Sequence, residues 1–382
     1  MKKQLRSKGR EYLNEMNEQS GPCLTVSLEC DGGGKNSQIH RDRLRRESVH
    51  ISKESGAAPA IRTILAKLES LVHDREMWGG EYQGVCIHIS EQVTRFLKLP
   101  YPPVEKATIE DYFSIRPAAD AIAALSEWLA LDVSLKAPRL FRFDGESARP
   151  LKDVELPSSV RSFSENGALD NGQKAHVRSS NEGGAPHMVN QGMNAAKSPR
   201  ELNETIFMRE IAHALNDFPE SKELPLVVIG DKRVVAEFLD TYSHSGGEVV
   251  RVSNVEAHPS PRQISKVCSE IAWEEQQRRK AQVLETIEEM RSREGIFSNN
   301  VREVYEAAKQ GRISAAVLAC DDDIWCRIGK DERPKSASSD DEDAFEALDR
   351  IYLETLLKDG DAIVMPESEI PGGKSVAAVF KW

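Results

Sequence analysis

Two stretches of the sequence could bind phosphate or a metal ion. Gly32-Gly33-Gly34-Lys35 follows a predicted strand and precedes a predicted helix, as phosphate-binding loops do. However, Glu29 occupies the place of the first glycine of that motif, and Asn36 replaces the Ser or Thr that binds magnesium. Residues 321–323 are three adjacent aspartates, but they lack the glycine-centred spacing of a calcium loop. We therefore predict a turn at the first stretch and a charged loop or helix start at the second.

The remaining candidates for catalysis are isolated residues. His213 follows Arg209-Glu210-Ile211-Ala212, which lacks the first histidine of a zinc-protease motif. The six cysteines are scattered and show no Cys-x-x-Cys spacing, as expected for reduced thiols in the cytoplasm. The sequence therefore predicts no catalytic residue, no metal site, no cofactor and no enzyme activity.

A run of arginines offers a different chemistry. Arg41, Arg43, Arg45 and Arg46 lie in a predicted helix over residues 37–51. Guanidinium groups bind phosphate oxygens bidentately, so such a helix suits contact with RNA. A solvated helix surface that carries i,i+4 ion pairs is the alternative. Both interpretations remain open from these residues alone.

The charge balance limits the possible partners. The chain has 382 residues and 51 bases against 62 acids, so its net charge is −11. This charge excludes a protein that coats DNA or RNA by bulk attraction. Residues 1–50 nevertheless carry ten bases and seven acids, a local balance of +3. A local RNA contact at this end is compatible with the net negative charge of the whole chain. No apolar run is long enough to span a membrane.

The elements that would position these residues alternate between helices and strands. We predict α/β and α+β folds in three domains, each a mixed sheet with packed helices, over residues 1–128, 129–219 and 220–382. The third domain is predicted to be an α/β sandwich whose sheet includes residues 224–229 and 248–252. Within the second domain, residues 164–200 form a long loop with little apolar periodicity, rich in Asn, Gly and Ser.

The order of several short stretches resembles the bacterial branch of the archaeo-eukaryotic peptide release factor and Pelota superfamily, over nearly the full chain. The stretches are Met77-Trp78-Gly79-Gly80, residues 84–90 and 96–100, Phe113-Ser114-Ile115-Arg116-Pro117, and residues 138–143, 148–151, 225–230, 246–249, 360–364 and 377–380. Within this superfamily, the length and order are most similar to a ribosome hibernation factor.

The sequence departs from the family at its catalytic motif. Release factors of this superfamily use a Gly-Gly-Gln loop, whereas this chain has Asn171-Gly172-Gln173 and Gly183-Gly184-Ala185. An asparagine adds a side chain where the backbone must come close to the ester. The loop keeps polar and basic groups that can contact RNA. They are Gln173, Lys174, His176, Arg178, His187 and Gln191.

The resemblance implies a cytoplasmic protein that binds in the ribosomal A site. The first domain would contact 16S rRNA through the arginine helix, and the middle loop would reach 23S rRNA at the peptidyl-transferase centre. The third domain would contact elongation factor Tu or a related translational GTPase. Because the hydrolytic motif is missing, we expect ribosome hibernation without peptide release. A peptidyl-tRNA-hydrolysing release or rescue factor is the alternative.

Overall fold

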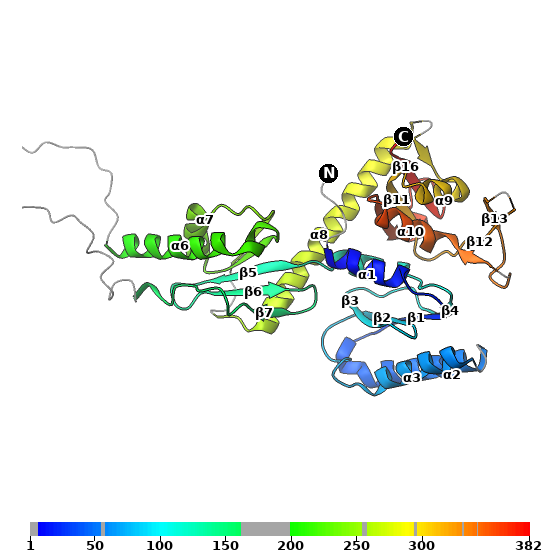
Figure 1. Ribbon diagram of the computed structural model, residues 1–382, viewed down its shortest axis with the longest axis horizontal. Helices are drawn as coiled ribbons and strands as arrows, with labels where there is room; N and C mark the ends of the chain where they lie inside the picture. Colours follow the sequence, from blue (N-terminus) through cyan, green and yellow to red (C-terminus); the bar gives the residue numbers. More distant parts are fainter. Residues whose placement is uncertain are drawn as a thin grey trace, which may run out of the picture. The chain divides into compact units, whose positions relative to one another are not determined.

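The computed structural model describes residues 7–54, 58–161, 199–253, 258–293, 296–330, 332–341 and 343–382. They form two compact units. Unit 1 combines Met1–Ser126 with Glu270–Trp382, and unit 2 is Glu127–Ser269. Both units contain mixed helices and sheets, which confirms the predicted fold class (Figure 1).

The N-terminal part of unit 1 is an antiparallel sheet with helices on it. Its elements are α1 (Ser7–Asn17), β1 (Cys23–Glu29), η1 (Gly33–Asn36), α2 (Ser37–Glu54), α3 (Pro59–His73), β2 (Gly84–Ile89), β3 (Thr94–Leu99) and β4 (Lys106–Glu110). The strand order is β3-β2-β1-β4. Leu24 and Val26 of β1 share a core with Leu44 of α2 and Leu68 of α3, so α2 and α3 lie together on one face.

The C-terminal part of unit 1 contains a second sheet, ordered β10-β16-β11-β15. Strand β11 pairs in parallel with β15 and antiparallel with β16, which fits the predicted α/β sandwich. The bounds are α8 (Pro261–Met290, which begins in unit 2), β10 (Phe297–Ser298), α9 (Val301–Lys309), β11 (Ile313–Ala319), β12 (Trp325–Ile328), β13 (Pro334–Ser336), β14 (Phe345–Glu346), α10 (Ala347–Leu357), β15 (Asp361–Met365), η4 (Glu367–Glu369) and β16 (Val376–Phe380).

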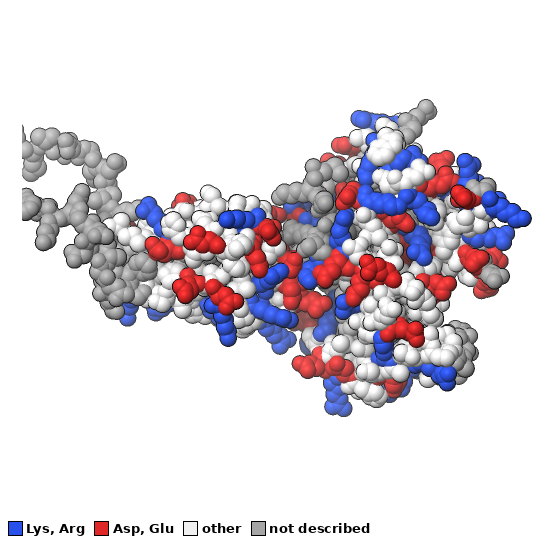
Figure 2. All heavy atoms as spheres, viewed as in Figure 1, with Lys and Arg blue, Asp and Glu red and all other residues white. Residues whose placement is uncertain are grey.

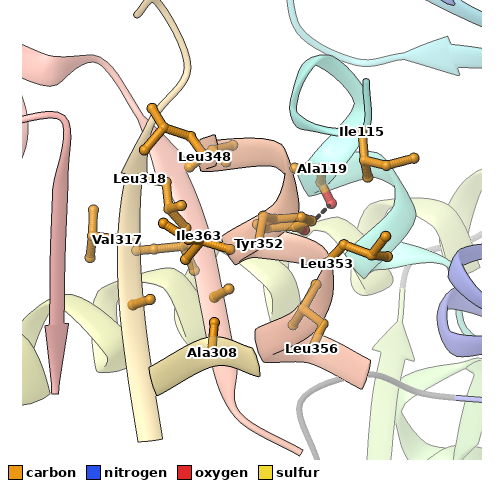
Figure 3. Close-up of a cluster of buried hydrophobic side chains, with 14 of the residues drawn as sticks. Ile115, Ala119, Ala308, Val317, Leu318, Leu348, Tyr352, Leu353, Leu356 and Ile363 are labelled. Carbon is orange, nitrogen blue, oxygen red and sulfur yellow. Dashed lines mark hydrogen bonds between the residues drawn. The ribbon is translucent and has the colours of Figure 1, made fainter. Parts of the chain in front are cut away.

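One hydrophobic core joins the two parts of unit 1. Two short helices follow the first sheet, η2 (Arg116–Ala118) and α4 (Ala119–Ala124). Ile115, directly before η2, and Ala119, the first residue of α4, pack toward Tyr352 and Leu353 of α10 (Figure 3). The Tyr352 hydroxyl donates to the Ala119 carbonyl at 3.3 Å. Apolar side chains from the two four-stranded sheets are therefore buried in the same core.

Arg116 lies at this junction and is 3% exposed. Its guanidinium is 2.6 Å from a carboxylate oxygen of Asp323, 3.0 Å from Glu346 and 3.5 Å from Asp349. It also donates to the carbonyl of Ala319 at 2.5 Å. A buried guanidinium cannot lose its charge, so these partners are required for its burial.

Asp349 is the most enclosed of these partners. It accepts hydrogen bonds from the Ser114 hydroxyl at 2.7 Å and from the backbone amides of Ile115 and Arg116 at 3.0 Å. Burial opposes its ionisation, but the charges of Arg116 and Lys106, together with its hydrogen bonds, hold the pKa of Asp349 below its usual value. The Asp349 carboxylate thus links the two parts of unit 1 through hydrogen bonds and an ion pair.

Unit 2 is a five-stranded sheet with the order β7-β6-β5-β8-β9. Its elements are β5 (Trp128–Val133), β6 (Arg139–Phe143), β7 (Ala148–Pro150), α6 (Pro199–Asp217), η3 (Pro219–Lys222), β8 (Leu226–Gly230), α7 (Lys232–Thr241) and β9 (Val249–Ser253). Leu129 and Leu131 of β5 share a core with Phe207 of α6 and Phe238 of α7, so these helices cover one face of the sheet.

The predicted domain boundaries differ from these units. The first, after residue 128, lies next to the start of unit 2 at Glu127. The second, after residue 219, does not separate two sheets, because β8 pairs in parallel with β5 and β9 pairs with β8. Residues 224–229 and 248–252, which the sequence pattern places in the third domain, instead complete the sheet of unit 2. Pairing between strands far apart in sequence decides this boundary, and apolar periodicity does not report it.

A buried histidine fixes α1 against the first sheet. His88 of β2 accepts a hydrogen bond at Nδ1 from the Tyr12 hydroxyl (2.6 Å), and its Nε2–H donates to the Ser114 carbonyl (2.9 Å). Burial lowers the pKa of His88 to about 4. The imidazole is therefore neutral in the folded protein near pH 7.

We expect Asp349→Asn to lower the free energy of unfolding by about 3–5 kcal/mol, because it removes one partner of a buried charge. Asp323→Asn is the matched control, since Asp323 is 41% exposed and also contacts Arg116. That change should cost about 1 kcal/mol or less. Denaturant titration measures both losses. Equal losses of unfolding free energy in the two variants would show that the buried Asp349–Arg116 interaction does not hold unit 1 together.

His88 should make the protein less stable in acid. Between pH 6.5 and about 4 the unfolded chain takes up a proton that the folded chain excludes, so stability falls as the pH falls. Compared with His88→Gln, which can keep both hydrogen bonds, the wild type should lose about 3 kcal/mol over this range. Unfolding curves recorded between pH 7 and pH 4 test this, and parallel losses in both proteins would contradict it.

Candidate functional site

Helix α2 carries the four predicted RNA-binding arginines, but they do not form one face. The spacing places Arg41 and Arg45 on the side toward α3, where Arg41 Nη1 lies 3.5 Å from the Val72 carbonyl. Arg43 points toward the sheet, donates to the Glu29 carbonyl at 2.6 Å and forms an ion pair with Glu105. Arg43 therefore holds α2 on the sheet.

Arg45 and Arg46 are the exposed members of the set. Arg45 lies 3.3 Å from Asp42 and 3.9 Å from Glu69, so its charge is partly balanced on the surface. Arg46 makes no ion pair with any residue that the structure describes. It lies between two exposed apolar side chains on the same helix face, Ile39 (57% exposed) and Val49 (51%). Arg46 is thus the member best placed to meet a partner.

The predicted loop residues Gln173, Lys174, His176, Arg178, His187 and Gln191 lie outside the described residues. The structure describes the helix that follows them. Glu204 of α6 has a buried carboxylate that contacts Arg233 at 2.7 Å and Arg200 at 3.2 Å. Burial opposes its charge, but bonds from Arg233 and Arg200 hold the pKa of Glu204 below its usual value. The beginning of α6 is thereby attached to α7.

The glycine-rich turn serves packing instead of phosphate binding. A Cβ at Gly34 would lie 2.7 Å from the backbone nitrogen and oxygen of Gly80, and one at Gly33 would lie 2.7 Å from the Tyr82 carbonyl. Gly33 also has a φ of 51°, which favours glycine. The backbone amide of Gly34 donates to the Gly80 carbonyl at 2.9 Å instead of facing a ligand. Asp31 and Gly32 form the predicted turn, and Gly33–Asn36 continue it as the short 3-10 helix η1.

The aspartates of residues 321–323 have three separate structural roles. Asp321 accepts from the Glu367 amide at 2.8 Å, and Asp322 accepts from the Ser375 hydroxyl at 2.6 Å. Asp323 contacts Arg116, as described above. Within the described residues, no group of three or more His, Cys, Asp or Glu side chains could hold a metal ion.

His88 of unit 1 has a strongly lowered pKa that the sequence does not indicate. His88 lies in β2, a strand rich in apolar residues, and its sequence neighbours do not indicate which partners its ring meets. Its ring is fully enclosed and both nitrogens are used by Tyr12 and Ser114. An imidazole without access to a substrate positions α1 and does no acid–base work. His213, in contrast, is exposed on α6.

The surface charge favours a local contact with RNA over binding of RNA along a whole face. On the face seen in Figure 2, Lys and Arg are interspersed with Asp and Glu in both units, without one continuous basic patch. No helix of the described chain is long and apolar enough to cross a membrane. An RNA contact would therefore depend on single exposed basic side chains such as Arg46.

Comparison with solved structures gives matches of low overall similarity. The archaeal translation termination factor aRF1 is 12% identical, with 100% of both chains covered and a TM-score of 0.22. Archaeoglobus fulgidus Pelota is 15% identical, with 76% of this chain and 75% of that chain covered and a TM-score of 0.34. A chain in a model of ribosome-bound archaeal Pelota and ABCE1 is 10% identical, with 100% and 98% covered and a TM-score of 0.38. At these scores the matches decide neither fold nor function.

The sequence comparison is more specific. No curated protein matches the chain. Residues 127–312, however, match the model of bacterial archaeo-eukaryotic release factor family 3. The matched region begins at the first residue of unit 2 and includes all of α8. This confirms the superfamily resemblance found in the sequence. Through this region, about half of the chain, the protein is similar to the bacterial archaeo-eukaryotic release factors.

Proposed function

We propose that this protein binds the ribosomal A site and takes part in ribosome hibernation without releasing peptide. The observation that carries the proposal is the family match over residues 127–312, in a chain whose middle loop lacks Gly-Gly-Gln. A chain that keeps the family's scaffold without its hydrolytic motif can occupy the site of a release factor and leave the ester intact. The closer sequence resemblance, to the hibernation factor Balon, supports the same role.

The partners follow from the same reasoning. Contact with 16S rRNA would use α2, because Arg46 is exposed between Ile39 and Val49 and has no described counter-ion. Contact with 23S rRNA would use the loop of residues 164–200, with Lys174 and Arg178 on phosphates. Elongation factor Tu or a related GTPase would bind the C-terminal part. This last partner rests on the resemblance alone.

The first prediction concerns RNA contact by α2. Arg46→Glu should weaken ribosome binding about tenfold, because a hydrogen-bonded charge contact is lost. The slope of log affinity against log salt should decrease by about 1. Pelleting with ribosomes over a salt series measures both quantities.

Two controls make this test specific. Arg46→Lys keeps the charge and should keep most of the affinity. Arg62→Glu makes the same charge change at an exposed position of α3 and should leave binding unchanged. Arg43 is unsuitable, because it forms an ion pair with Glu105 and its replacement would disturb the fold. Wild-type affinity and salt dependence in Arg46→Glu would remove α2 from the interface.

The second prediction concerns chemistry. Ribosomes that carry labelled peptidyl-tRNA should release no peptide above background when the purified protein is added, and Gln173→Ala should change nothing. A release factor with Gly-Gly-Gln is the positive control. Peptide release that Gln173→Ala abolishes would show that Asn171-Gly172-Gln173 is a working form of the motif, and the alternative of a hydrolysing rescue factor would replace our proposal.

A further inference from the structure

A second surface feature of unit 1 is a cavity of about 110 Å³ where α1, the turn after β4 and α10 meet. Its floor is apolar and includes Phe113, Ile115 and Leu353, which are 3%, 1% and 6% exposed. Figure 3 shows Ile115 and Leu353 on adjoining elements. Polar side chains form the rim. A planar ligand with polar edges would suit this combination.

The aromatic side of the rim is held rigidly. The Tyr112 hydroxyl accepts a hydrogen bond from the backbone amide of Glu346 at 2.6 Å, next to the buried Arg116 cluster. The Arg350 guanidinium lies over the Tyr112 ring, 4.3 Å from its centroid. One face of this guanidinium is therefore against Tyr112. Arg350 also lines the cavity, and guanidinium planes stack on aromatic systems, so a flat group bound there could stack on it.

The two charged side chains at the cavity, Asp111 and Arg350, lack ion-pair partners among the described residues. Within the part of the chain that the structure describes, neither Arg350 nor Asp111 makes an ion pair. Asp111 is exposed, and Arg350 is half-buried. A simple anion would be repelled by Asp111, and a simple cation would be repelled by Arg350. A neutral ligand with a flat face for Arg350 and N–H donors for Asp111 satisfies both groups.

We propose that this cavity binds a guanine base, either of a free guanine nucleotide or of an unpaired stretch of RNA. Guanine carries two adjacent N–H donors on its Watson–Crick edge, which a carboxylate can accept together, and unpaired bases stack on arginine planes. Adenine presents an acceptor at the same place and would repel the carboxylate. The site does not depend on the proposed ribosomal role, because a free nucleotide can test it.

The direct test is calorimetric titration of the full chain with guanosine monophosphate and, separately, with adenosine monophosphate. We expect guanosine monophosphate to bind about tenfold or more tightly, the discrimination typical of a bidentate base contact. Asp111→Asn should abolish this preference, and Arg350→Lys, which keeps the charge but loses the plane, should weaken binding about tenfold. Thermal unfolding verifies that both variants fold. Equal affinity for the two nucleotides would exclude a free nucleotide as the ligand, and full affinity in Arg350→Lys would overturn the proposal.

A second arm distinguishes the two sources of the base. An RNA hairpin with one unpaired guanine in its loop is compared with the same hairpin carrying adenine there. Tight binding of the nucleotide alone assigns the cavity to a free nucleotide, and preference for the guanine hairpin assigns it to RNA. Absence of a guanine preference in both arms rejects the site. Because Arg46→Glu should leave guanosine binding unchanged, failure of the cavity and failure of the ribosomal proposal are separable.

Discussion

The charge of Arg116 is the constraint on which unit 1 depends. A guanidinium remains protonated at any physiological pH, so its burial requires carboxylates that are buried with it. Asp349 and Glu346 begin α10, while Arg116 follows the first sheet. The hydrogen bonds of Asp349 to Ser114, Ile115 and Arg116 turn this charge balance into a fixed geometry. The two four-stranded sheets of unit 1 then share one core.

This arrangement separates structural charges from those available to partners. Arg43 and Arg116 have carboxylates within contact distance and hold elements together. Arg46 and Arg350 have no ion pair with a described residue, and both are placed beside apolar side chains. A cation without a counter-ion gains the most from an incoming acceptor or a flat base. The two surfaces that we assign to ligands follow from this difference.

Much of the secondary structure could be predicted from local sequence. The helical spacing of Ile61, Ile64 and Leu68 is typical of a helix such as α3, and the alternation from Cys23 to Glu29 is typical of a strand such as β1. A short edge strand such as β4 has little sequence signal, because a proline-rich segment directly precedes it. The division after residue 219 was wrong, since the pairing of β5 with β8 joins segments separated by the long loop. Local periodicity carries no information about such pairing.

The candidate sites show the same limit. The arginine run was visible in the sequence, but which members are free depends on Glu105 and Glu69, which come from other elements. The cavity of Asp111 and Arg350 has no local signal at all. Its side chains meet only because α10 packs against the turn after β4.

The central claim, that a release-factor scaffold occupies the A site without hydrolysis, is tested most directly by a cryo-electron microscopy reconstruction of the protein on ribosomes that carry peptidyl-tRNA. Our account predicts density for the chain in the A site, with α2 against 16S rRNA and the peptidyl ester intact in the P site. An empty A site, or a chain bound there beside a deacylated tRNA, would contradict it.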